Sequence, residues 1–135
     1  MEERVLYGFQ FKINSKKRKY YNVVLQCVTM KVVIQVSEKD KIPMGNIVGS
    51  HIAVLKDVET IEVVFLEGAI VATVNEEMIK PLLEEKKLIL MACKTSMEMN
   101  NIKASDLVKG VSPTPQGGFI EIIRRQQEGW YYIHV

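Results

Sequence analysis

The thiol of Cys93 is the side chain whose position points most directly to chemistry in this 135-residue chain. It follows the apolar run "LILMA" and precedes the polar segment "KTSMEMNN". The first segment predicts a buried strand and the second predicts a helix. Unpaired backbone N–H groups and the positive end of the helix dipole stabilise an anion at such a junction. We therefore predict that Cys93 is a nucleophile.

Four residues are candidates for stabilising the Cys93 thiolate or lining its pocket. Lys94 supplies a cation, and Thr95 and Ser96 supply hydroxyl and backbone donors. Such neighbours lower the pKa of a cysteine below its ordinary value of about 8.5. Gly68 follows an earlier predicted strand, where it could let backbone N–H groups approach the sulfur or be an ordinary turn glycine. The alternative for Cys93 is a buried thiol that only fills space.

The remaining cysteine and the histidines suggest no metal centre. Cys27, His51 and His134 show no zinc-ligand spacing with Cys93, and no CxxC pair is present. Either histidine could carry a proton for Cys93, although a structural role explains both. The chain has no GxGxxG or Walker pattern, so no nucleotide cofactor is expected. We predict a site without metal or cofactor, and free thiols.

Composition and charge indicate a globular domain. Apolar residues make up 47% and charged residues 25% of the chain. No apolar run approaches the roughly 20 residues of a membrane helix, and the N-terminus lacks a secretory signal. We therefore expect a cytoplasmic protein without membrane contact. The basic segment 16–21, "KKRKYY", could touch nucleic acid or be a solvated tail, and the mildly acidic remainder makes nucleic-acid binding unexpected.

Strands alternate with helices from residue 30 onward. The predicted strands are residues 31–36, 60–68, 88–92 and 131–135, which are rich in β-branched and apolar side chains. Such alternation predicts an α/β domain with a mainly parallel sheet, in which ligands gather at the carboxyl ends of the strands. We assign this domain to residues 30–135. Residues 1–29 form a basic extension, either disordered or produced by a translation start upstream of Met30.

Two helices are predicted before Cys93. The first is expected to begin at Asn46, with Val48, Ile52 and Leu55 on one face. The second is expected to begin at Asn75 and to be kinked or restarted by a proline at position 81.

A short helix is predicted after Cys93. Thr95 and Glu98 have the spacing of a capping box, and Asn101 suits a left-handed helix end. One more helical turn is expected from Ser105. Residues 110–115, which hold a glycine and two prolines, predict a loop.

The last predicted helix lies in "QGGFIEIIRRQQEGW". Phe119, Ile122, Ile123 and Gln126 are expected to share its buried face, with Gly129 ending it.

Charged and aromatic residues gather near the end of this helix. Arg124 and Arg125 complement the helix dipole, or they contact an anion at a subunit interface. Trp130, Tyr131 and Tyr132 are expected to be buried by the sheet or by an oligomer interface.

Residues 30–135 resemble the DsrE/DsrF-like family of small sulfur-relay proteins. The similar segments are "MKVVIQVSE", "IEVVFLEGAIV", "MACKTSMEMNNIKASDLVKGV" and "GGFIEIIRRQQEGWYYIHV". Members commonly have Gly where this chain has Asn101, a mild departure because Asn tolerates positive φ.

The resemblance implies a three-layer α/β sandwich that assembles as a homo-oligomer, often a trimer or hexamer. It also implies that Cys93 accepts sulfane sulfur as a persulfide from a donor protein and passes it to an acceptor protein. The alternative is a non-catalytic oligomeric module of the same fold, binding or regulatory, with a structural Cys93.

Overall fold

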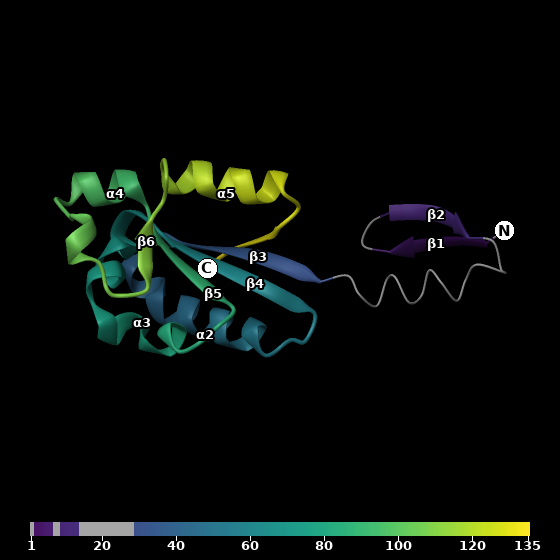
Figure 1. Cartoon of the computed structure of the whole chain (residues 1–135), viewed down its shortest axis with the longest axis horizontal. Helices are drawn as coiled ribbons and strands as arrows, with labels where there is room; N and C mark the ends of the chain where they lie inside the picture. The colour runs from purple at the N-terminus through teal and green to yellow at the C-terminus, as the bar shows by residue number, and fades with distance from the viewer. Residues whose placement is uncertain (1, 7–8, 14–28) are drawn as a thin grey trace.

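A five-stranded sheet in which all strands are parallel forms the centre of the computed structural model (Figure 1). The structure describes residues 2–6, 9–13 and 29–135. Its strands are β3 (Met30–Val36), β4 (Val58–Phe65), β5 (Leu88–Ala92), β6 (Val111–Pro113) and β7 (Tyr131–His134), in the spatial order β6-β5-β4-β3-β7. This confirms the predicted α/β class.

The N-terminal segment forms a separate pair of strands. Strand β1 (Glu2–Leu6) pairs antiparallel with β2 (Phe9–Ile13). The basic segment 16–21 and Cys27 lie outside the described residues.

Helices cover both faces of the large sheet and give it three layers. Helices α2 (Ile42–Ala53) and α3 (Glu76–Leu83) lie on one face, and α5 (Gly118–Gln127) lies on the other (Figure 1). The short helix α4 (Lys94–Met99) follows β5 at the carboxyl end of the sheet. The described residues also form the 3-10 helices η2 (Lys39–Lys41), η3 (Glu67–Val74) and η4 (Ala104–Asp106). None of the described helices is both long and apolar enough to cross a membrane.

The two faces of the sheet carry cores of different size. The larger core, beneath α2 and α3, takes alternate residues of the strands, among them Val32, Ile34, Ile61, Val63, Phe65 and Leu90. The smaller core, beneath α5, contains Val33, Val64, Leu66, Cys93, Ile122 and Trp130. Strand β4 is buried on both faces from Ile61 to Phe65, including the charged Glu62.

Two predictions for the early helices need correction. Helix α2 begins at Ile42 rather than Asn46, because Pro43 is well suited to a first helical turn. Asn46 lies inside the helix, and its Nδ2 donates to the Met78 carbonyl at 2.7 Å. Helix α3 begins after Asn75, as predicted. It runs through Pro81 to Leu83 as one helix, so the proline does not restart it.

Predictions around Cys93 were partly right. The residue that caps α4 is Cys93 itself, whose sulfur accepts from Ser96 N–H, rather than Thr95. Asn101 adopts the expected left-handed conformation, with φ of 54°. The predicted loop 110–115 contains strand β6, whose Val111 pairs with Leu90 of β5. Three residues with a proline at one end are too few to show a strand pattern, and a sheet edge tolerates that proline.

The predicted buried face of α5 was wrong. Ile122 is buried, but Phe119 and Ile123 are 54% and 56% exposed, and Glu121 is 5% exposed. The reason lies in the sheet, where Glu62 projects from the centre of β4 and binds Arg125. The helix therefore turns Glu121 and Arg125 inward beside Ile122, and leaves Phe119 and Ile123 facing outward.

Candidate functional site

The sulfur of Cys93 lies where two helices begin. Cys93 follows β5, and its backbone N–H donates to the Phe65 carbonyl of β4 at 2.9 Å. Its Sγ accepts from Ser96 N–H of α4 at 3.5 Å and from Gly118 N–H of α5 at 3.1 Å. Two amide donors, one from each helix, therefore converge on one sulfur atom.

The approach of α5 requires glycine at position 118. A Cβ added there would lie 3.0 Å from Cys93 Cβ, 3.2 Å from its Sγ and 3.3 Å from a methyl of Val64. The backbone of α5 can thus reach the sulfur only because the side chain is absent. Sequence reasoning placed Gly118 in the last helix without linking it to Cys93. The available signal was the Gly117–Gly118 pair directly before the helix.

Ser96 is held in a position to support the same sulfur. Its side-chain oxygen accepts from Glu67 N–H at 2.8 Å, and the residue is 7% exposed. The hydroxyl proton is therefore free to be donated to Cys93. Glu67 has φ of 51°, which costs a residue with a side chain about 1 kcal/mol or more. This backbone conformation positions the Glu67 N–H against Ser96.

These donors set the protonation of the thiol. Burial raises the pKa of Cys93, but hydrogen bonds from the Ser96 side chain and from the backbone of Ser96, Gly118 and Thr95 lower it. The net effect is a pKa below the ordinary value. The site therefore favours the thiolate, which is the nucleophilic form of cysteine.

A cavity of about 380 Å³ opens beside this sulfur. Its walls are mainly apolar and include one acidic side chain. The lining residues are Leu66, Glu67, Cys93, Thr95, Ser96, Met99, Gly117, Gly118, Phe119 and Ile120. Cys93 is only 4% exposed, so a reagent reaches the sulfur through this cavity rather than from the open surface.

The predicted pocket residues are only partly brought together. Thr95 and Ser96 line the cavity with Cys93, whereas Lys94 lines a neighbouring cavity of about 440 Å³. Gly68 does not line the Cys93 cavity, and a Cβ added there would contact backbone atoms of Lys39 and Ser37. The two residues before it, Leu66 and Glu67, line the cavity instead. Sequence reasoning missed Glu67, although it directly precedes that glycine.

Neither histidine lines this cavity. His51 is exposed on α2, on the opposite face of the sheet from α5, and His134 is exposed on β7. Within residues 2–6, 9–13 and 29–135 there is no cluster of three or more metal-ligating side chains.

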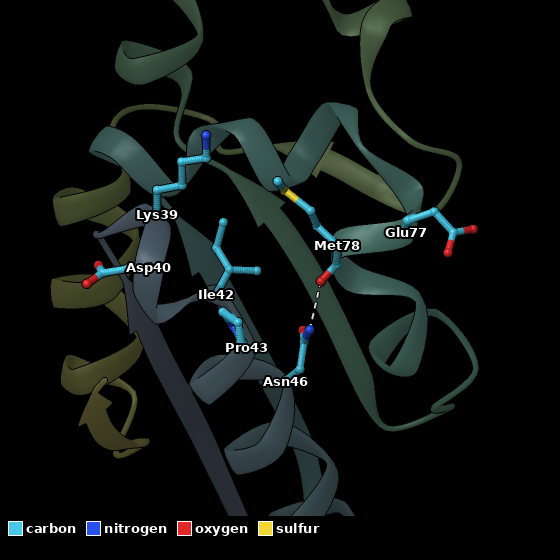
Figure 2. Close-up of a pocket in the computed structure, with 7 residues that line it drawn as sticks. All are labelled: Lys39, Asp40, Ile42, Pro43, Asn46, Glu77 and Met78. Carbon is cyan, nitrogen blue, oxygen red and sulfur yellow. Dashed lines mark hydrogen bonds between the residues drawn. The ribbon is translucent and has the colours of Figure 1, made fainter.

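A larger cavity of about 680 Å³ lies between the first turns of α2 and α3 (Figure 2). Ile42 and Met78 point into it, and the carboxylates of Asp40 and Glu77 point away to opposite sides. Asn46 at its base uses its Nδ2 to bind Met78 O. The residues that line it include no thiol, hydroxyl or histidine, and its titratable side chains are Lys39, Asp40 and Glu77.

Comparison with known proteins supports the fold without naming an activity. No protein-family model and no curated protein matches the chain. A protein of unknown function from Methanobacterium thermoautotrophicum is similar in structure, with a TM-score of 0.68 and 25% identity, covering 78% of this chain and 99% of its own. Another from Bacteroides thetaiotaomicron has a TM-score of 0.61 and 15% identity, covering 78% of this chain and 94% of its own.

Gly118→Ala should raise the pKa of the Cys93 thiol, because the new methyl pushes the α5 N–H away from the sulfur. We also expect the free energy of unfolding to fall by about 1–3 kcal/mol from overpacking. The rate of alkylation by iodoacetamide, followed against pH, measures the first effect. Quantifying the tryptic peptide 88–94 separates Cys93 from Cys27.

Gly68→Ala is the matched control for this substitution. A Cβ there meets Lys39 N and Ser37 O at 3.5 and 3.6 Å, which is ordinary contact. Its alkylation profile should equal that of the unchanged protein. If Gly118→Ala also leaves the profile unchanged, α5 does not stabilise the thiolate.

Proposed function

We propose that this protein is a sulfur-relay protein of the DsrE-like type, in which Cys93 accepts sulfane sulfur and passes it on as a persulfide. The observation that carries the proposal is the Cys93 sulfur, which accepts amide hydrogen bonds from the first turns of α4 and α5 beside a cavity. We place the reaction in the reducing cytoplasm, where free thiols persist.

The transfer step needs only the groups that the site contains. The Cys93 thiolate attacks the outer sulfur of a donor persulfide, R–S–SH, forming a new S–S bond to Cys93. The S–S bond of the donor breaks, and R–S⁻ leaves with the electron pair. One S–S bond replaces another, so no external oxidant or reductant is required. Attack by an acceptor thiolate on the Cys93 persulfide repeats the exchange and regenerates Cys93.

Burial of the sulfur suits this chemistry. Thiolates and persulfides are readily oxidised, and limited access slows that loss. At 4% exposure Cys93 is shielded from bulk solvent, while the cavity keeps a route for one reactant.

The walls of the cavity favour a donor group without negative charge. Leu66, Met99, Phe119 and Ile120 provide apolar surface, and Glu67 is the one charged side chain among the lining residues. A small anion entering here meets a carboxylate and a thiolate, with no basic side chain in the lining to offset them. We therefore propose that the donor presents its outer sulfur on an uncharged, apolar group, whether on a small persulfide or on a donor protein.

We also propose that the protein acts as a homo-oligomer, with a trimer or hexamer expected. The outward face of α5 exposes Phe119, Ile120 and Ile123, each about half accessible. Phe119 and Ile120 also form part of the wall of the Cys93 cavity. A second copy seated on this face would bury apolar surface and complete one wall of the cavity.

One observation favours the rival, a non-catalytic module with a structural cysteine. Cys93 packs with Val33, Val64 and Ile122 in the smaller core. The two functions differ in the behaviour of the thiol. A relay thiol reacts with the protein folded, whereas a purely structural thiol reacts only when the protein unfolds.

Cys93→Ser should abolish loading with sulfane sulfur. After incubation with an uncharged, apolar organic persulfide, mass spectrometry of the unchanged protein should show one added sulfur atom on the tryptic peptide 88–94. The serine variant should show none there, because its hydroxyl is not a comparable nucleophile. If the unchanged protein takes up no sulfur at Cys93 while folded, the relay function fails and the structural role stands.

Glu67→Gln should increase the rate of alkylation by iodoacetate relative to iodoacetamide. The two reagents differ mainly in the negative charge of iodoacetate, so the ratio reports the charge that a reactant meets. Because Glu67 is exposed, we expect an increase of only about two- to threefold at low salt, disappearing at high salt. Glu98→Gln, which lies in the neighbouring cavity, is the control. If the ratio of the iodoacetate rate to the iodoacetamide rate is the same in the unchanged protein, Glu67→Gln and Glu98→Gln, the cavity does not select against negative charge.

Ile123→Glu should reduce the molecular mass in solution to that of the monomer, because it puts a charge into the proposed interface. Light scattering or sedimentation measures the mass. Val54→Glu is the control, since Val54 is 76% exposed at the end of α2 on the opposite face. A monomeric unchanged protein, or an oligomer that tolerates Ile123→Glu, would contradict this interface.

A further inference from the structure

A second group of buried titratable side chains lies beneath α5, away from the Cys93 cavity. Glu62 of β4 is completely buried, and Glu121 of α5 is 5% exposed. Arg125, one helical turn after Glu121, binds both carboxylates. Its Nε lies 2.8 Å from Glu62 Oε2 and 3.3 Å from Glu121 Oε1. We call Glu62, Glu121 and Arg125 the α5 anchor.

The surroundings of the α5 anchor contain few other charges. Arg125 Nη1 lies 3.0 Å from Glu128 Oε2 at the exposed end of the helix. The guanidinium of Arg125 stacks 4.5 Å from the centre of the Trp130 ring, and Lys31 Nζ of β3 lies 5.8 Å from that centre.

Neighbouring strands add no charge opposite Glu62. Its partners in register are Val33 of β3 and Ile89 of β5, both apolar. The net charge at Glu62 is therefore set mainly by Glu121 and Arg125.

The charges of the α5 anchor do not balance when both carboxylates are ionised. Two buried carboxylates then face one guanidinium, and Glu62 Oε1 finds no hydrogen-bond partner among the residues that the structure describes. An ionised oxygen left unpaired in a buried site is costly, and one proton held by the pair removes the excess charge. Burial, together with a hydrogen bond and repulsion from Glu121, raises the pKa of Glu62 to about 7, against the lowering effect of Arg125.

Helix α5 connects the α5 anchor to the reactive sulfur. Its first residue, Gly118, donates to Cys93 Sγ, and the inward side chains of its next two turns include Glu121 and Arg125. Cys93 and Trp130 belong to the same small core. A change in the seating of α5 therefore acts at both places.

We propose that Glu62, with Glu121 and Arg125, is a proton-linked positioning device that seats α5 and thereby sets the reactivity of Cys93. This device acts on the reactivity of the Cys93 thiol, whether or not the protein transfers sulfur. When the carboxyl pair holds one proton, the α5 anchor is neutral and the helix packs against β4. When that proton leaves, a net negative charge is buried, which opposes both the packing of α5 and formation of the Cys93 thiolate.

The same proton affects stability in a defined direction. In the folded protein the pKa of Glu62 is about 7, whereas in the unfolded chain Glu62 has its ordinary pKa of 4.5. The folded state therefore binds more protons between these values, so the contribution of Glu62 to the free energy of unfolding falls as pH rises from 4.5 to about 7.

Glu62→Gln tests the device, because glutamine imitates the protonated carboxyl at all pH values. Trp130 is the only tryptophan of the chain, so its fluorescence reports on the α5 anchor. The unchanged protein should show a fluorescence transition centred near pH 7, and Glu62→Gln should show none. Cys93→Ser should retain the transition, whatever the outcome of the sulfur-loading experiment.

The alkylation rate of Cys93 provides the second readout. In the unchanged protein its pH profile should be broader than a single ionisation, and in Glu62→Gln it should follow one ionisation. At pH 8 we expect the variant to react about two- to fivefold faster, since one buried negative charge has been removed.

Two further variants make the result decisive. Glu59→Gln changes an exposed acid of the same strand, which binds Thr29 Oγ1 at 2.7 Å, and should behave like the unchanged protein. Glu121→Gln removes the hydrogen bond and the repulsion that raise the pKa of Glu62, and should move the fluorescence transition to lower pH, which keeps the test open if Glu62→Gln folds poorly. A transition that stays near pH 7 in either variant, or unchanged alkylation profiles, would overturn the proposal.

Discussion

One contact organises the carboxyl end of the sheet, the hydrogen bond from Gly118 N–H to the sulfur of Cys93 at 3.1 Å. It requires β5 and the start of α5 to meet at the same edge of the sheet, although 25 residues separate them in sequence. It also requires glycine, because any side chain at position 118 would occupy the space of the sulfur. With Ser96 N–H on the other side, this contact lowers the pKa of a cysteine that packs in a small core.

The seating of α5 follows from a charge placed at the centre of the sheet. Glu62 lies on the buried strand β4, so the helix that covers it has to supply a partner, and Arg125 does so. Two features follow from that requirement. The inward face of α5 carries Glu121 and Arg125, and the outward face carries Phe119 and Ile123 without cover in the isolated chain.

The fold alone does not decide among activities. Two proteins with a similar structure are of unknown function, and one fold supports many kinds of chemistry. A function therefore has to be inferred from the site, where a shielded thiol, convergent amide donors and an apolar cavity occur together. Persulfide exchange fits these groups because it needs a thiolate and access for one sulfur atom, and nothing else.

Local patterns in the sequence determined the order of strands and helices, the parallel α/β class and the position of Cys93 between β5 and α4, because each depends on neighbouring residues. Local reasoning failed where partners distant in sequence decide the outcome. The buried face of α5 was misjudged because it is set by Glu62, and the neighbours of the sulfur were incomplete because Gly118 and Glu67 reach it from other elements. Periodicity shows which residues of a helix share a face, but only the tertiary structure shows what that face meets.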